Sequence, residues 1–189
     1  MTGGHDRALE LLERALTYTR TTLSSVGPDR SGPTPCAGWS LADLLAHMDD
    51  GLDAFLEAAG GAVRVEVPRR TGADLEQLQR KACHLLGVWS SPTPPLVVVG
   101  DQQLPTDLLV SAAALEISVH GWDVSQATGL DQPLPDDLAR RLLPVARRIV
   151  AEEDRSERFS APVTPDPGAG WPVQLLGFLG RTRRPVLHS

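Results

Sequence analysis

The chain has 189 residues, of which 41% are hydrophobic, 22% are charged and only 4% are aromatic. This length suits one domain, and a core built mainly from Leu, Val and Ala favours helices. The formal net charge of −6, with basic residues gathered only in short arginine pairs, excludes a nucleic-acid phosphate backbone as a favoured partner.

The N-terminus and the cysteine content indicate the compartment. The first residues pass directly into an amphipathic pattern and lack the apolar core of a signal peptide, and Cys36 and Cys83 are the two cysteines. We therefore expect a cytoplasmic, reduced protein. No apolar run approaches the roughly 20 residues that span a bilayer, so we expect no membrane association.

Two helices are predicted in the first third of the chain. Apolar residues recur at helical spacing over residues 9–23, before the stop signal at residues 27–28. Ser40 is a favourable N-cap for a second helix over residues 41–59, and Asp43 stands three residues later, as in a capping box.

The middle of the chain continues in the same way. A third helix is predicted over residues 74–89 and a fourth over residues 105–128, with Gly129 placed to cap it. Residues 96–105, "LVVVGDQQLP", could form one short strand, but without an obvious partner they are predicted to be an extended loop.

The C-terminal part is predicted to hold a fifth helix over residues 136–153, with Pro144 as a kink, then a Pro-rich loop and a short apolar turn at residues 173–179. Together these elements predict an all-α fold: a four-helix bundle with an additional C-terminal helix and an extended tail. We expect the bundle to occupy residues 1–155, and the loop and short helix of residues 156–189 to pack on it. In bundles, ligand and metal sites are formed by inward-facing side chains of adjacent helices.

Three titratable side chains are predicted to face this interior. Glu116 and His120 are four residues apart on one face of the fourth helix, and His47 lies in an apolar stripe of the second helix. Two imidazoles and a carboxylate can hold a divalent metal and leave one coordination position open, as in catalytic zinc sites. Asp123, on the same side of the fourth helix, could orient a ligand histidine through its second nitrogen or could instead cap a loop.

A purely structural explanation of these residues stays open. A histidine on an apolar face commonly donates to a carbonyl, and a Glu–His pair at this spacing can simply form a hydrogen bond. Against this, burying an unpaired carboxylate is costly, so an inward-facing Glu116 needs a partner, which a cation would supply.

Two segments carry a resemblance to a known family. "PTPCAGWSLADLLAHM" and, some seventy residues later, "EISVHGWDVSQATG" resemble the paired signatures of the DinB/YfiT-like metal-binding superfamily, in its actinobacterial branch related to mycothiol-dependent maleylpyruvate isomerase. The terminal piece "RFSAPVTPDPGAGWPVQLLGFLGR" is similar to the ending of short members of that branch. The resemblance implies a four-helix bundle in which His47, Glu116 and His120 bind Zn²⁺ or another divalent ion such as Ni²⁺.

The resemblance also implies a type of chemistry. A low-molecular-weight thiol, mycothiol in actinobacteria, would bind the metal, lose its proton and attack a small electrophile. The outcome would be S-transfer or a thiol-assisted isomerisation, with a metal-bound thiolate or water as the reactive group. The isomerase carries a further C-terminal domain, whereas this chain ends about sixty residues after the second signature, so we do not expect maleylpyruvate isomerisation itself.

The sequence is also compatible with other functions. A non-catalytic protein could use the same pocket to bind or sequester a small molecule, and a structural helical adaptor would need no metal; a homodimer also stays open. Trp39 and Trp122 are expected to pack helix ends, and Cys36 to be a small buried hydrophobe, because no base is identifiable beside it. Cys83 and its neighbour His84 diverge around their helix. The pocket walls are expected from loops 60–72 and 90–105 and from the last thirty residues.

Overall fold

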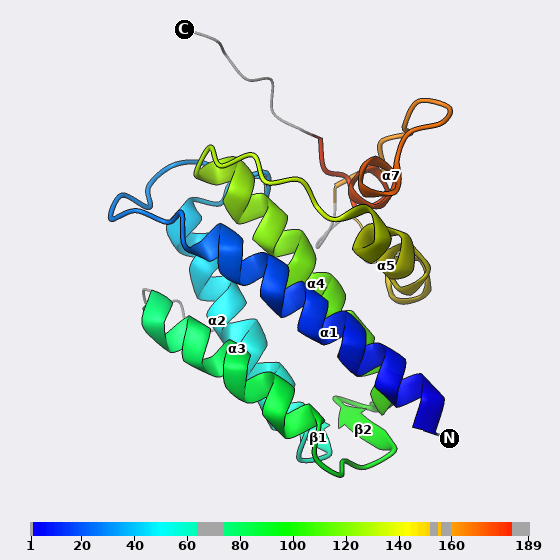
Figure 1. Ribbon diagram of the computed structural model, residues 1–189. Coiled ribbons are helices and arrows are strands. Elements are labelled where there is room, and N and C mark those ends of the chain that lie inside the picture. Colours follow the sequence, from blue (N-terminus) through cyan, green and yellow to red (C-terminus); the bar gives the residue numbers. More distant parts are fainter. Residues whose placement is uncertain (1, 64–73, 152–154, 156–159, 183–189) are drawn as a thin grey trace, which may run out of the picture.

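The computed structural model describes residues 2–63, 74–151, 155 and 160–182. Four long helices lie together as a bundle: α1 (Thr2–Leu23), α2 (Leu41–Ala58), α3 (Leu75–Trp89) and α4 (Thr106–Ala127) (Figure 1). Two shorter helices, α5 (Asp136–Ile149) and α7 (Trp171–Phe178), pack against each other beside α4. The predicted all-α class and helical bundle are confirmed. Within the described residues, no helix has both the length and the apolar composition that crossing a bilayer requires.

Helix α4 is the centre of the bundle. Its sequence is rich in apolar residues, and residues 113–125 are buried except for Glu116, because α1, α2 and α5 pack around it. The closest approach is made by α1, where a Cβ atom at Gly121 would overlap the side chain of Thr19. The Thr19 hydroxyl donates to the carbonyl of Ile117 at 2.8 Å, so this close approach also satisfies a buried polar group.

The predicted caps are present at the start of α2 and after the end of α4. The Ser40 hydroxyl accepts from the backbone N–H of Asp43, and the Asp43 carboxylate accepts from the backbone N–H of Ser40, which is the predicted capping box of α2. Beyond α4, Gly129 has a φ of 72°, the left-handed conformation expected of a residue that stops a helix.

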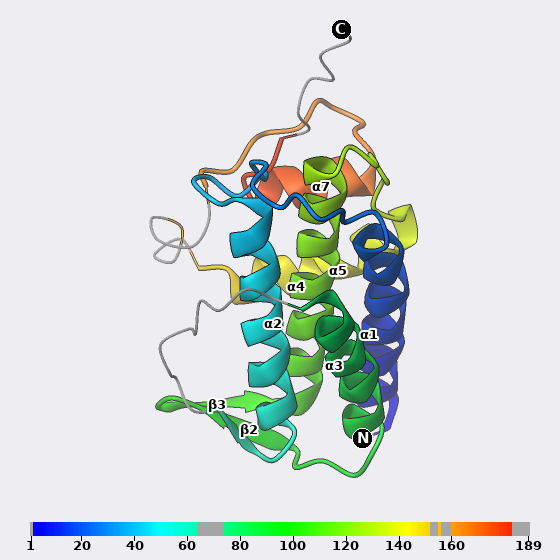
Figure 2. The same cartoon turned by 90° about the vertical axis from the view of Figure 1, so that its left-hand side faces the viewer.

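A small sheet replaces the predicted loop at residues 96–105. Strands β2 (Leu96–Val99) and β3 (Gln102–Pro105) form an antiparallel hairpin, and β1 (Ala62–Val63) pairs with β2 in parallel. The sheet closes one end of the bundle (Figure 2). The loop prediction is wrong because Gly100, with a φ of 62°, allows a tight turn and the segment that follows α2 supplies a third strand.

The C-terminal helices differ from prediction at their ends. Helix α5 includes Pro144 but stops at Ile149 and not at residue 153, because Val150 is extended, with φ −98° and ψ 102°. Helix α7 begins at Trp171, two residues earlier than predicted, since Pro172 is well suited to a first turn.

Candidate metal centre

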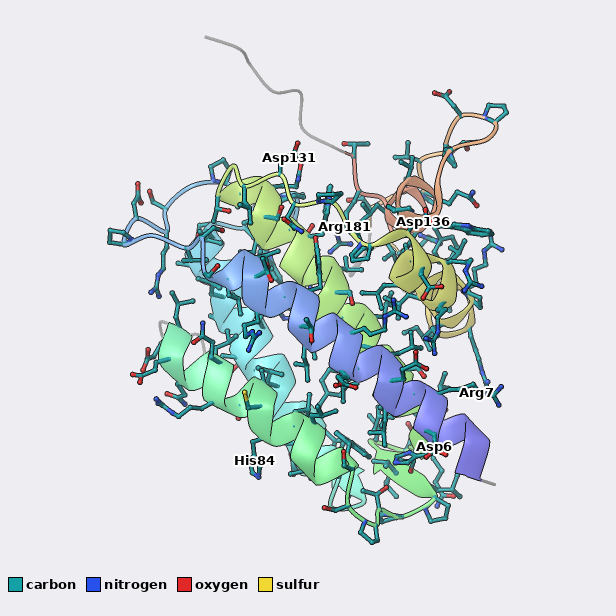
Figure 3. The ribbon with its side chains drawn as sticks, in the orientation of Figure 1. Asp6, Arg7, His84, Asp131, Asp136 and Arg181 are labelled. Carbon is teal, nitrogen blue, oxygen red and sulfur yellow. The ribbon has the colours of Figure 1, made fainter. Side chains whose placement is uncertain are left out.

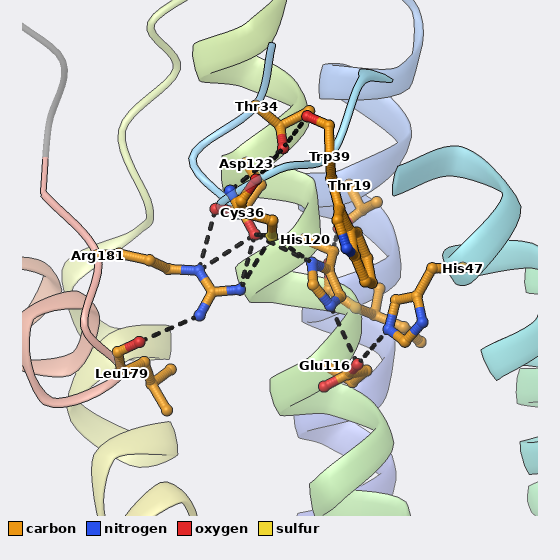
Figure 4. A network of polar contacts seen from close by, with 11 residues as sticks. Thr19, Thr34, Cys36, Trp39, His47, Glu116, His120, Asp123, Leu179 and Arg181 are labelled. Atoms are coloured by element: carbon orange, nitrogen blue, oxygen red, sulfur yellow. Dashed lines mark hydrogen bonds and ion pairs between the residues drawn. The ribbon is translucent and has the colours of Figure 1, made fainter. Parts of the chain in front are cut away.

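Two imidazoles and a carboxylate meet where α2 faces α4. Oε1 of Glu116 lies 3.0 Å from Nε2 of His47 and 3.0 Å from Nε2 of His120 (Figure 4). One candidate ligand atom from each side chain lies within 4.8 Å of the other two. The structure thus brings together the three residues that were predicted to share a site.

The hydrogen bonds of His120 require its ring to be protonated on both nitrogens. Its Nδ1 lies 3.0 Å from Oδ2 of Asp123, while its Nε2 faces Glu116. Carboxylates only accept, so both ring nitrogens must donate, which only the imidazolium form can do. Burial lowers the pKa of His120, but the charge of Glu116 and the hydrogen bond to Asp123 outweigh burial and raise that pKa well above its usual range.

The same arrangement suits a divalent cation. Burial raises the pKa of Glu116, but His120 and His47 outweigh it and hold that pKa well below its usual range, so this carboxylate is ionised. A cation between Glu116 and the two rings would take the place of the protons that bridge these groups in its absence. Two imidazole nitrogens and one carboxylate oxygen form the donor set of many catalytic zinc sites. The residues therefore fit a divalent metal.

Asp123 connects this centre to the C-terminal segment. Its side chain is fully buried, and Arg181, which follows α7, donates to it through Nε to Oδ1 at 3.0 Å and through Nη2 to Oδ2 at 2.9 Å. Burial raises the pKa of Asp123, but the charge of Arg181 and the hydrogen bonds from His120 and Arg181 hold it below its usual value. Asp123 is therefore ionised, and its hydrogen bond to Nδ1 fixes the orientation of the His120 ring.

Cys36 lies beside the same carboxylate, contrary to the expectation that it has no base nearby. Its Sγ donates to Oδ2 of Asp123 at 3.3 Å and lies 4.0 Å from Nδ1 of His120. Nη2 of Arg181 approaches Sγ at 3.6 Å. The loop before α2 is thereby tied to α4 and to the C-terminal segment.

The two tryptophans of the signature segments have different environments. Trp39 lies against both histidine rings, with its centroid 4.9 Å from that of His47 and 6.5 Å from that of His120. Its expected role as packing at a helix end is therefore incomplete, because it also covers one side of the candidate centre (Figure 4). Trp122, which is 4% exposed, belongs to the core.

An apolar cavity of about 350 Å³ adjoins the centre, with the three candidate ligands in its wall. Helices α1, α2, α3 and α4 line it. The prediction that loops form the walls is wrong for the described parts of residues 60–72 and 90–105, none of which lines this cavity. Cys83 lies at the cavity, whereas His84 points away from the bundle (Figure 3), so the two diverge as predicted.

Comparison with known proteins agrees with this arrangement. Residues 9–125 match the family described as the mycothiol maleylpyruvate isomerase N-terminal domain. Two uncharacterized proteins of Mycobacterium tuberculosis, MT0763 of strain CDC 1551 / Oshkosh and Rv0738 of strain ATCC 25618 / H37Rv, are each 28% identical over 177 residues, which cover 91% of this chain and 96% of theirs. No solved structure matches the chain. The family match spans more than half of the sequence and includes both helices that carry the candidate metal triad, which is His47, Glu116 and His120. The chain therefore belongs to the family of the mycothiol maleylpyruvate isomerase N-terminal domain.

Proposed function

We propose that this protein is a metal-dependent enzyme that uses a low-molecular-weight thiol, such as mycothiol, to attack a small electrophile. His47, Glu116 and His120 would bind Zn²⁺ or another divalent ion such as Ni²⁺. The observation that carries the proposal is the convergence of two imidazole nitrogens on one carboxylate oxygen, each at 3.0 Å, beside an apolar cavity. Membership of a mycothiol-related family supports the thiol as cosubstrate.

A divalent ion at such a site lowers the pKa of a thiol or water that binds to it and polarises a carbonyl group. The protein's own residues supply binding and orientation. Asp123 holds Nδ1 of His120, so that Nε2 is directed at the centre. Trp39 covers the two rings and excludes water from one side, while His47 and Glu116 keep 37% and 40% of their side-chain surface exposed, which leaves another side open to substrates.

The reaction would form a bond between sulfur and carbon. The ionised thiol gives an electron pair to the electrophilic carbon, and a leaving group departs with the pair of its own bond, which produces a thioether conjugate. If the carbon belongs to a conjugated double bond, the new carbon–sulfur bond can break again after rotation, and the result is an isomerisation. Both outcomes require the same thiol and the same open position.

Metal content is the direct test. We expect about one equivalent of divalent metal in purified protein by elemental analysis, and a loss of roughly 10-fold or more in metal affinity for His120→Ala. His84→Ala is the matched control, because His84 is an exposed histidine of α3 outside the site. A metal-free wild type that resists reconstitution with zinc and nickel would contradict the proposal, as would equal metal content in both variants.

Turnover distinguishes an enzyme from the alternative, a non-catalytic protein that binds or sequesters a small molecule in the same cavity. Thiol consumption would be followed with a panel comprising an enone, an epoxide and an aryl halide. Saturable consumption that disappears with a chelator supports the enzyme. Uptake that stops at one equivalent per chain supports the binding protein.

A further inference from the structure

The cavity beside the triad has a chemistry of its own that the metal ligands do not explain. Its volume of about 350 Å³ lies in the range of small-molecule sites. Away from the three candidate ligands its walls are mainly aliphatic and aromatic, with side chains from all four helices: Leu16, Leu23, Leu52, Phe55, Leu86 and Ile117. Such walls favour an apolar ligand, because polar groups there would lose their water without gaining partners.

Gly51 keeps part of this space open. It lies inside α2 and lines the cavity, although glycine in a helix interior is less favourable than alanine. No backbone requirement explains it, since its φ is not in the left-handed range, and apart from its two chain neighbours and the adjacent backbone of α2, no heavy atom of the described chain lies within 4 Å of where its Cβ would stand. Gly121 differs, because there a Cβ would overlap Thr19. The missing side chain at residue 51 therefore adds volume to the cavity and relieves no clash.

The position of Gly51 relates this volume to the candidate metal centre. It follows His47 by four residues, so the two lie on the same face of α2. Side chains on a helix lean toward its N-terminus, and a side chain at residue 51 would thus extend toward His47. A larger residue there would fill the part of the cavity through which a ligand reaches the triad.

The charges at the rim restrict the ligand further. Glu13 and Arg20, both exposed on α1, line the cavity with opposite signs, and the neutral Thr17 of α1 and Gln79 of α3 line it as well. One charge of each sign gives no net preference for an anion or a cation. The ligand that fits is uncharged.

We propose that this cavity binds the electrophilic substrate, that the substrate is an uncharged, largely apolar small molecule, and that Gly51 determines the size it accepts. The inference rests on the proposed function in calling the bound molecule a substrate. Binding in the cavity can be measured without turnover.

N-phenylnaphthylamine, an uncharged dye that fluoresces in apolar surroundings, is the probe. We expect saturable binding to the wild type, weaker binding of the negatively charged anilinonaphthalene sulfonate, and a loss of affinity of roughly tenfold or more in Gly51→Leu. Gly87→Leu is the matched control. Gly87 lies inside α3, likewise has no described heavy atom within 4 Å of its Cβ position beyond its chain neighbours and the adjacent helix backbone, and does not line the cavity, so the affinity of Gly87→Leu should equal that of the wild type.

Far-UV circular dichroism checks that each variant is folded. If Gly51→Leu does not fold, Gly51→Ala takes its place, with Gly87→Ala as its control. Its single methyl displaces about one methylene of ligand, so the expected loss is about fourfold. Equal affinities in the folded Gly51 and Gly87 variants would overturn the proposal, because the probe would then bind elsewhere, for instance at the apolar groove beside Trp122 and Val173. Preference for the sulfonate would overturn it as well.

Metal content of the same samples separates the two proposals. If the wild type binds zinc but Gly51→Leu binds the probe as tightly as the wild type does, the cavity proposal alone is contradicted. Protein that binds the probe as expected but no divalent metal contradicts the proposed function alone. We expect Gly51→Leu to keep its metal, because the substitution leaves all three ligands in place.

Discussion

Replacing Arg181 by methionine should strongly destabilise the fold while leaving every candidate metal ligand in place. Asp123 is fully buried, and within the described structure Arg181 is the sole hydrogen-bond partner of its Oδ1 atom. Breaking a buried ion pair from one side costs about 3–5 kcal/mol, because an uncompensated charge is left behind. His120 still faces the carboxylate and compensates part of this charge, so we expect about 3 kcal/mol, measured by urea denaturation in the presence of a chelator.

An exposed arginine of similar geometry provides the control. Nη1 of Arg14 lies 2.7 Å from Oδ2 of Asp137, but both side chains are 42% exposed, and surface pairs contribute only about 0–1 kcal/mol. Arg14→Met should therefore lose much less than Arg181→Met. The double variant Asp123→Asn/Arg181→Met, in which no buried charge is left unpaired, should be more stable than the sum of the single effects by about 2 kcal/mol. Equal losses for Arg14→Met and Arg181→Met would refute the reasoning.

Substitutions at three further positions test the scaffold. Gly121→Ala should lower the free energy of unfolding by about 1–3 kcal/mol, since its Cβ would overlap Thr19; an unchanged melting temperature would contradict this. Burial, with a contribution from the charge of Asp123, raises the pKa of Tyr18 in the folded protein. The unfolded chain therefore loses this proton first, so the stabilising contribution of Tyr18 is complete below about pH 10 and declines as the pH rises above that value. Tyr18→Phe should lack this alkaline decline in urea titrations, and parallel curves for the two proteins would argue against it. Ser40→Ala should cost about 1 kcal/mol in urea denaturation by loss of the α2 cap, whereas Ser40→Thr, which keeps the hydroxyl that donates to Oδ2 of Asp43, should keep most of it.

The part of the site that one helix carries is predictable from sequence because it depends on local spacing. Glu116 and His120 are one helical turn apart, and any continuous helix places them on one face. His47 needs a second step, the assumption that the apolar stripe around it faces the same core. The packing of α2 against α4 supports that step.

The partners of Asp123 are not predictable in this way. Arg181 and Cys36 stand 58 and 87 residues away from it, so their contacts depend on how the whole chain folds. Nothing in local composition separates Arg181 from the other arginines near the C-terminus. The β2–β3 hairpin escapes prediction for a related reason, since the strand that completes its sheet is the two-residue β1, too short to leave a periodic pattern.

The two sides of His120 differ in physical character, and this difference separates stability from selectivity. Behind the ring, Asp123, Arg181 and Cys36 form a charged network contributed by three distant segments, in which the loss of Asp123 or Arg181 leaves a buried polar group without its partner. In front of it lies an apolar space whose shape is set by side-chain size, as at Gly51. Apolar walls accept changes of volume more readily than a buried charge accepts the loss of its counter-charge. Substitutions in front should therefore change which molecule the proposed site accepts, while substitutions behind should change the stability of the fold and the affinity for the proposed cation.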